Sequence, residues 1–271
     1  MNTATASATV TTTGADGTTV DHAVVSQDRW IAERQKLMGH EKELTHLRDQ
    51  IARERHALPW VRIDKDYVFD GPEGRVRLAE LFAGRRQLLV QHFMFGPGWD
   101  QGCPSCSFMA DHVDSMNVHL KQRDVSFVAV SRAPIAEIER FRRRMGWQFP
   151  WVSSNTNDFN FDFHVSFTAE ERAKGEVYYN YHRMPFRSEE APGISTFYRD
   201  DAGTIFHTYS TYGRGVEVMM GTYNMLDLMP KGRDERDVAY KMEWLRHHDR
   251  YEPAPVVKAA PASTSCCHAE S

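Results

Sequence analysis

The sequence predicts an α/β protein in which a central mixed β-sheet is flanked by helices, forming a three-layer sandwich. Two near-continuous apolar runs, residues 88–95 and 125–131, are typical of strands buried on both faces of a sheet. A helix signal follows each run, and this alternation implies a parallel strand–helix–strand unit with a right-handed crossover. Residues 195–199 and 204–209 flank the turn sequence DDAG, which predicts an antiparallel hairpin.

The two ends of the chain are expected to lie outside this sheet. Residues 1–25 are rich in Thr, Ala and Gly and predict a disordered tail, and the Pro/Ala/Ser composition of residues 251–271 predicts a flexible one. Between residues 26 and 58 the pattern predicts one long helix, with Ser26 as its N-cap. Its apolar stripe is narrow, so we expect the helix to dock by one edge on the domain or on a second subunit, as in a homodimer.

The main domain is expected to span residues 59–250. Within it, residues 153–192 are too many for a plain connection and too aromatic for disorder. We interpret them as an insertion with partial structure that walls the active face of the domain.

Composition excludes several classes of function. The 271 residues contain 41% hydrophobic and 26% charged residues, which is typical of a globular protein. The formal net charge of −4 gives no bulk attraction to nucleic acid or to anionic membranes. No apolar run is long enough for a membrane span, and the N-terminus has no secretory signal pattern. Because four cysteines in a chain of this length suit a reducing compartment, we expect a cytoplasmic protein.

The most informative motif is Cys103-Pro104-Ser105-Cys106, which follows the first apolar run through a Gly/Pro-rich turn. The pattern places Cys103 at the start of a helix covering about residues 104–121, where unpaired N–H groups favour a thiolate. Pro104 suits the first helical position, because its missing N–H would be unpaired there anyway. Cys106 lies one turn further on, close enough to form a disulfide with Cys103.

Other interpretations of the cysteines remain open. The pair could be structural or half of a zinc site, although no second C-x-x-C supplies the other ligands. On the same fold, a copper(I) or zinc site could combine Cys103 and Cys106 with His207. The tail sequence Cys266-Cys267-His268 could bind a soft metal ion, resolve a mixed disulfide or be dispensable. A non-catalytic interaction module is a further alternative.

The order of strand, C-x-x-C helix, crossover, hairpin and closing helix is that of a thioredoxin-like domain. The chain also resembles the DUF899 family of predicted dithiol–disulfide oxidoreductases, which are similar to AhpC/TSA proteins. The resemblance spans about residues 26–250. The stretches that carry it are LPWVRIDKDYVFDGPEG, QHFMFGPGWDQGCPSCSFMADH, AVSRAPIAEIERFRRRMGWQFPWVSS, DFNFDF and FHTYSTYGRG.

This resemblance implies roles for the residues of the motif. Cys103 would be the solvent-facing nucleophile and Cys106 the buried resolving thiol, flanked by Trp99, Pro104 and Ser105. The substrate would be an unidentified disulfide or oxidised thiol, and a reducing thiol system would regenerate the dithiol without any cofactor. The peroxiredoxin signature P-x-x-x-T-x-x-C is absent.

More distant residues are candidates for contact with the substrate. Ser195 aligns with the position where thioredoxins carry a cis-proline before the strand that faces the dithiol. His207, Tyr209 and Tyr212 belong to a hydroxyl-rich stretch that could reach the dithiol or simply form a hydrogen-bonded strand end. Asp111 is a candidate proton acceptor for Cys106, with a solvated helix position as the alternative. His92, on a central strand, is interpreted as a hydrogen-bonded core histidine.

Overall fold

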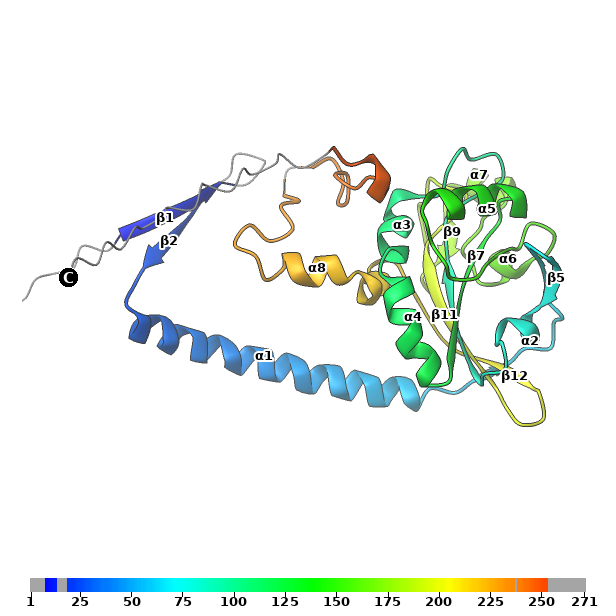
Figure 1. The fold of residues 1–271 in the computed structure, drawn as a ribbon, viewed down its shortest axis with the longest axis horizontal. Helices are drawn as coiled ribbons and strands as arrows, with labels where there is room; N and C mark the ends of the chain where they lie inside the picture. Colours follow the sequence, from blue (N-terminus) through cyan, green and yellow to red (C-terminus); the bar gives the residue numbers. More distant parts are fainter. Residues whose placement is uncertain (1–7, 14–18, 237, 253–271) are drawn as a thin grey trace, which may run out of the picture.

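The computed structural model describes residues 8–13, 19–236 and 238–252 (Figure 1). Its helices and strands, with 3₁₀ helices labelled η, are in chain order β1 (Ala8–Thr13), β2 (Thr19–Val24), α1 (Gln27–His56), β3 (Val61–Arg62), β4 (Val68–Gly71), β5 (Gly74–Arg77), α2 (Leu78–Leu81), β6 (Gln87–His92), α3 (Pro104–Ala110), α4 (Val113–Gln122), β7 (Val125–Ser131), α5 (Ile135–Arg144), β8 (Trp151–Ser153), α6 (Phe159–Asp162), α7 (Ala169–Ala173), β9 (Val177–Tyr179), β10 (His182–Met184), β11 (Gly193–Arg199), β12 (Ile205–Tyr212), η1 (Gly213–Met219), α8 (Gly221–Leu226) and η2 (His248–Arg250).

A mixed sheet of eight strands forms the centre of the molecule, in the order β3-β12-β11-β6-β7-β8-β4-β5. Strands β6, β7 and β8 run parallel, whereas β11 pairs antiparallel with both β6 and β12. The hairpin β11–β12 is the one that the sequence predicts, and Gly203 takes the left-handed conformation (φ +85°) in its turn. The C-x-x-C helix follows the central strand β6 directly.

The sheet separates two hydrophobic cores. Along β7, Phe127 and Ala129 contribute to the core that contains Cys106, and Val128 and Val130 contribute to the other. Since side chains alternate between the faces of a strand, the two cores lie on opposite faces. Helices α3, α4 and α5 cover the first face, and α2 and α6 cover the second. This confirms the expected thioredoxin-like three-layer arrangement.

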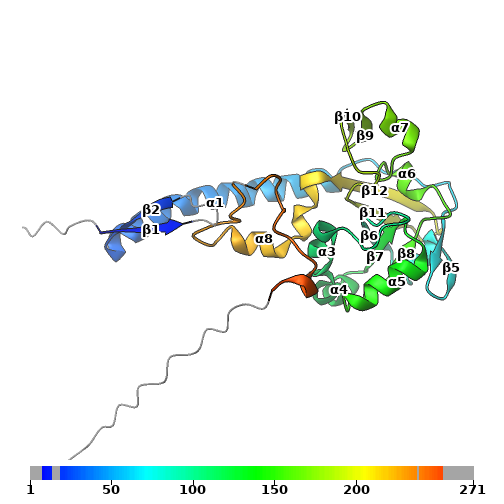
Figure 2. The same cartoon turned by 90° about the horizontal axis from the view of Figure 1, so that it is seen from above.

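Helix α1 projects away from the sheet (Figures 1 and 2). It begins as predicted, with the Ser26 hydroxyl accepting a hydrogen bond from the N–H of Arg29. None of its residues is buried, and at its last turn Arg55 lies 5.3 Å from the ring centroid of Tyr209. Over the described part of the chain, no helix has both the length and the apolar character needed to cross a membrane. The exposed large apolar side chains of α1 are Trp30, Ile31, Leu37, Met38, Leu44 and Leu47.

The N-terminal region differs from the expected disorder. Strands β1 and β2 form an antiparallel hairpin in which Thr11 donates a hydrogen bond to Asp21 at 2.6 Å. Threonine and valine make up most of β1 and half of β2, and their β-branched side chains favour the extended conformation. The C-terminal tail is described only to residue 252, so Cys266, Cys267 and His268 lie outside the described residues.

The insertion contains short elements, as expected, but it covers mainly the face opposite to the C-x-x-C helix. Phe159 and Phe163 anchor it in the second core. Helix α7 and the hairpin β9–β10 stand apart from α3 (Figure 2). Pro192 at its end lines a cavity beside the cysteines, and Glu190 and Tyr179 interact electrostatically with Cys106.

Candidate redox site

The turn that delivers Cys103 is fixed by close packing. A Cβ atom at Gly102 would lie 2.6 Å from Phe93 and 2.8 Å from Phe141, so only glycine fits there. The buried His247 donates a hydrogen bond to the carbonyl oxygen of Gly102 at 2.8 Å. The aromatic core therefore determines where the first cysteine lies.

Cys103 is a half-buried N-cap residue whose thiol is prepared for ionisation. A hydrogen bond from the thiol of Cys106 lowers the pKa of the Cys103 thiol to about 7, and the N–H groups of Ser105 and Cys106 and the Ser105 hydroxyl add to this effect. Pro104 occupies the first helical position, as predicted. A large fraction of Cys103 is therefore thiolate at neutral pH.

Cys106 has the opposite character. It is 2% exposed, and its Sγ accepts a hydrogen bond from the N–H of Met94 at 3.5 Å. Gln91 holds the carbonyl oxygen of Cys106 at 3.2 Å and so fixes the helix on the sheet. The hydrogen bond to Cys103 and burial raise the pKa of the Cys106 thiol well above its usual range. The pair therefore consists of one accessible thiolate and one buried neutral thiol.

A buried carboxyl group near the pair was not anticipated from the sequence. Glu190 is 1% exposed, accepts a hydrogen bond from Ser166 at 2.6 Å and pairs with Arg132 at 2.9 Å. Burial raises the pKa of the Glu190 carboxyl to about 7. Its charge contributes to the raised pKa of Cys106. Because Glu190 lies near the end of an irregular insertion, no pattern in the sequence indicates that it is close to the dithiol.

Asp111, the proton acceptor considered from the sequence, is engaged elsewhere. Its Oδ1 accepts hydrogen bonds from Trp147 Nε1 at 2.8 Å and from His248 Nδ1 at 2.7 Å. It lies at the C-cap of α3, where the single helix expected over residues 104–121 is broken into α3 and α4. The structure therefore gives Asp111 a structural role between helix ends, and Glu190 is the better-placed carboxyl group.

Trp99, expected from the sequence to flank the site, lies in the turn before Cys103. Its indole packs against the core that contains Cys106, and its Nε1 donates a hydrogen bond to Glu189 at 2.9 Å. This bond connects the turn before Cys103 to the end of the insertion, next to Glu190. The two segments that surround the dithiol thus hold one another in place.

A cavity of about 400 Å³ opens beside the two thiols. We call it the dithiol cavity. Pro192, which directly precedes β11, forms part of its wall, whereas the sequence alignment placed Ser195 at this location. Most of the remaining wall comes from segments that follow the sheet: residues 213–223, Arg233, Glu235, Lys241 and Met242. Its apolar lining includes the side chains of Met94, Met109, Met220 and Met242.

Ser195 does not face the dithiol. Ile194 belongs to the core that contains Cys106, so the next residue of the strand points to the opposite face. There the Ser195 hydroxyl lies 2.7 Å from His92 Nε2 and 2.7 Å from the hydroxyl of Ser210, which in turn lies 2.7 Å from His207 Nε2. His92 is a hydrogen-bonded core residue, as predicted, and burial lowers the pKa of its imidazole to about 3.

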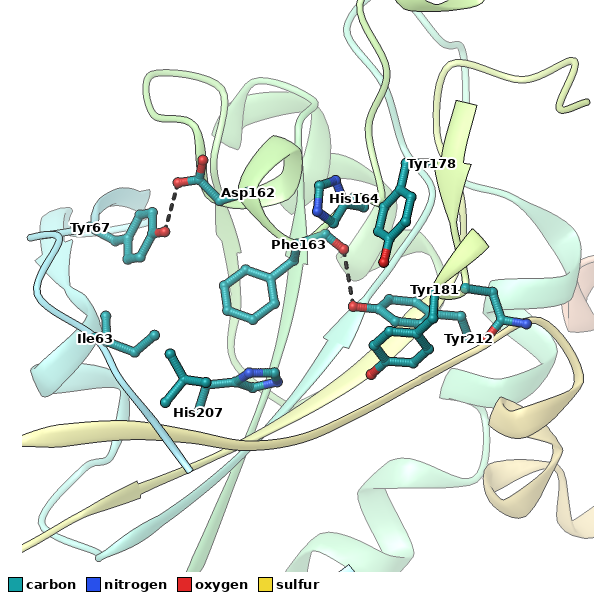
Figure 3. A pocket seen from close by; sticks show the side chains of 11 residues that line it. Ile63, Tyr67, Asp162, Phe163, His164, Tyr178, Tyr181, His207 and Tyr212 are labelled. Atoms are coloured by element: carbon teal, nitrogen blue, oxygen red, sulfur yellow. Dashed lines mark hydrogen bonds between the residues drawn. The ribbon is translucent and has the colours of Figure 1, made fainter. Parts of the chain in front are cut away.

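His207 and Tyr212 line a different cavity, of about 310 Å³, on this opposite face (Figure 3). We call it the tyrosine cavity, because Tyr67, Tyr178 and Tyr181 surround it together with Tyr212. The Tyr212 hydroxyl donates a hydrogen bond to the Phe163 carbonyl oxygen at 3.1 Å. Tyr209 lies instead beneath Arg55 of α1. None of the four substrate-contact candidates therefore reaches the dithiol.

This placement also separates His207 from the cysteine pair. The imidazole packs against Phe163 and Phe197 of the second core, whereas Cys106 belongs to the first. Across residues 8–13, 19–236 and 238–252, no three His, Cys, Asp or Glu side chains form a group that could hold a metal ion. The metal site considered from Cys103, Cys106 and His207 is therefore not assembled.

Comparison with known proteins identifies the family. The model of a family described as "Bacterial protein of unknown function (DUF899)" matches residues 19–251. The chain belongs to the DUF899 family. The match covers the dithiol, Glu190 and the wall of the dithiol cavity, so all of them are parts of a DUF899 domain. No curated protein matches the sequence of this DUF899 protein.

Solved structures similar to this DUF899 protein are distant. Peroxidoxin BcpB from Mycobacterium tuberculosis has 15% identity and a TM-score of 0.40, covering 60% of this chain and 93% of its own. A peroxiredoxin Q from Xanthomonas campestris has 11% identity and a TM-score of 0.40, covering 59% and 90%. A protein described as the thiol:disulfide interchange protein DsbE, from Chlorobium tepidum, has 13% identity and a TM-score of 0.37, covering 62% and 98%. The fold assignment rests on the sheet order and helix positions of the DUF899 chain itself.

Proposed function

We propose that this protein is a thiol–disulfide oxidoreductase that uses Cys103 and Cys106. The observation that carries the proposal is the difference between the two thiols: a half-buried Cys103 with a pKa of about 7 beside a buried Cys106 whose pKa is raised. A nucleophile must be ionised and accessible, whereas a resolving thiol needs to ionise only after the first step. This division of roles is what a dithiol catalyst requires.

The reaction follows from these roles. The Cys103 thiolate attacks one sulfur of a disulfide, forms a mixed disulfide and releases the other half as a thiolate, which takes a proton from water. Cys106 then loses its proton, for which we propose the carboxylate of Glu190 as acceptor because it interacts electrostatically with this thiol. The Cys106 thiolate attacks the Cys103 sulfur and breaks the mixed disulfide, so that the second half of the substrate leaves as a thiolate and takes up a proton from water. The products are the second substrate thiol and a Cys103–Cys106 disulfide. A reducing thiol system, such as that of the cytosol, returns the pair to the dithiol without a cofactor.

The first test is the reduction potential of the pair. The protein is equilibrated in glutathione or dithiothreitol redox buffers, and the two thiols are trapped and counted by mass spectrometry. Cys266→Ser and Cys267→Ser are introduced in the parent protein so that only the dithiol can titrate. We expect a reversible two-electron transition between about −120 and −270 mV, the range of catalytic dithiols. A pair that forms no reversible disulfide contradicts the proposal.

Trapping of the intermediate separates the two roles. In the same parent protein, Cys106→Ser should accumulate a mixed disulfide at Cys103 when a disulfide substrate is added. Cys103→Ser should form none, because burial keeps the pKa of the Cys106 thiol raised and the thiol therefore stays neutral. Equal trapping by both variants would show that the two cysteines are equivalent and would contradict their assigned roles.

A second test addresses the hydrogen bond between the thiols. Cys106→Ala removes the donor, so the pKa of Cys103 should rise from about 7 toward the ordinary value of a cysteine. Cys106→Ser keeps a hydroxyl donor and should retain most of the lowered pKa. The measurement is the rate of alkylation by iodoacetamide as a function of pH. Identical profiles for the two variants would show that the second side chain does not activate Cys103.

A further inference from the structure

We propose that the dithiol cavity binds the alkyl chain of an aliphatic disulfide and thereby selects this class of substrate for Cys103. The inference rests on the proposed oxidoreductase function and adds the substrate class to it. The cavity is about 400 Å³ in volume, within the range of small-molecule sites, and both thiols belong to its lining. A substrate held there would lie beside the nucleophile.

The lining favours an apolar and variable chain. Four methionines surround the thiols, and Val216 and the ring of Tyr223 extend the apolar surface. Methionine is unbranched and polarizable, so its side chains adapt to ligands of different shape. A rigid polar molecule would find few hydrogen-bonding partners here, whereas an alkyl chain would displace water from apolar surface.

Both arginines of the lining are paired with carboxylates. Arg214 pairs with Glu217 at 2.9 Å, and Arg233 pairs with Glu217 at 3.2 Å and with Asp227 at 2.8 Å. A carboxylate of the substrate that approached either arginine would have to compete with these pairs.

The remaining lining carboxylate is satisfied as well. Glu235 Oε1 accepts hydrogen bonds from the Tyr223 hydroxyl and from Trp244 Nε1, both at 2.6 Å, and from the N–H of Met242 at 3.1 Å. The surface of the cavity beside the thiols is thus mainly apolar, and Lys241 is a solvent-exposed charge in its lining.

The experiment measures oxidation of the reduced protein by disulfides of increasing apolar length. Bis(2-hydroxyethyl) disulfide, diethyl, dipropyl and dibutyl disulfide are compared, in the parent protein with Cys266→Ser and Cys267→Ser. The rate at which each disulfide oxidises the protein is divided by the rate at which the same disulfide oxidises dithiothreitol. This normalisation removes differences in intrinsic reactivity between the disulfides. We expect the normalised rate to rise about fourfold for each methylene that enters the cavity. Bis(2-hydroxyethyl) disulfide should react more slowly than dipropyl disulfide.

Variants locate the selectivity in the cavity. Met220→Gln and Met242→Gln keep the length of the side chain but place an amide in the lining, so the ratio of dibutyl to bis(2-hydroxyethyl) rates should fall about tenfold. Met229→Gln is the matched control, since Met229 is exposed and outside the lining. It should leave the ratio unchanged. Circular dichroism shows whether each lining variant is folded. Two lining variants are used so that the test still stands if one of them fails to fold.

The outcomes distinguish the two claims. Normalised rates that do not depend on chain length, while every disulfide reacts, would overturn the substrate class and leave the oxidoreductase function standing. If the normalised rate depends on chain length but neither lining variant changes this dependence, the dithiol cavity is not its origin, and the proposal is overturned. If no disulfide oxidises the pair, the proposed function itself fails.

Discussion

At the scale of single residues, one hydrogen bond and one buried charge make two cysteines chemically different. The Cys106 thiol stabilises the Cys103 thiolate, and burial keeps Cys106 itself neutral. Glu190 acts on the same pair from the insertion, and its own pKa of about 7 lets it take up or release a proton near neutral pH. Such shifts arise where desolvation and specific partners act together.

Glu190 should make stability depend on pH. Its carboxyl has a pKa of about 7 when folded and about 4.5 when unfolded. The protonated group therefore favours the folded state below about pH 4.5, and this contribution is lost as the pH rises through about 7. Relative to Glu190→Gln, the wild type should lose about 3 kcal/mol of unfolding free energy over that interval.

Urea unfolding at pH 4.5 and 7.5 measures this difference. The control is Glu43→Gln, which removes the same charge from an exposed position on α1. The free energy of unfolding of this variant should change with pH as that of the wild type does. If Glu190→Gln also follows the wild type, the carboxyl is not perturbed by burial.

At the scale of elements, the break between α3 and α4 positions the wall of the dithiol cavity. His112 Nδ1 donates to the Phe108 carbonyl oxygen at 2.9 Å, and its Nε2 accepts from the N–H of Thr222 at 3.1 Å. A Cβ atom at Gly221 would lie 3.1 Å from the imidazole, so α8 begins in close contact with it. One side chain thus connects the helix break to the segment that closes the cavity.

His112→Ala should loosen that segment. Loss of these hydrogen bonds should cost about 1–2 kcal/mol and speed the hydrogen exchange of residues 213–226. Hydrogen exchange followed by mass spectrometry gives the measurement, with His119→Ala on the exposed side of α4 as the control. Unchanged exchange in the His112 variant would mean that α8 is held by other contacts.

At the scale of the whole molecule, the sheet separates two faces with different contents. The dithiol cavity lies on the face covered by α3, α4 and α5, and the tyrosine cavity lies on the other. Helix α1 and the hairpin β1–β2 project away from the domain that contains the sheet (Figures 1 and 2). The exposed apolar side chains of α1 could form an interface with a second copy, so the expected homodimer remains a prediction.

Removal of residues 1–56 should leave the main domain intact. Because no residue of α1 is buried, we expect the free energy of unfolding to change by less than about 1 kcal/mol. Chemical denaturation of the shortened and full-length proteins tests this, and a larger loss would show that α1 supports the core. Sedimentation equilibrium of both proteins tests the homodimer: a dimer mass only for the full-length chain would place the interface on the removed segment.

The sequence by itself determined the central strands, the C-x-x-C helix start and the β11–β12 hairpin, because hydrophobic period and turn chemistry are local properties. It also identified Cys103 and Cys106, since their spacing alone brings the thiols together. Only the tertiary structure decided what surrounds them. A shift of one residue along a strand exchanges its faces, which is why Ser195 points away from the dithiol. Glu190, Met220 and Met242 come from segments distant in the sequence, and their convergence on the dithiol depends on packing that no local pattern encodes.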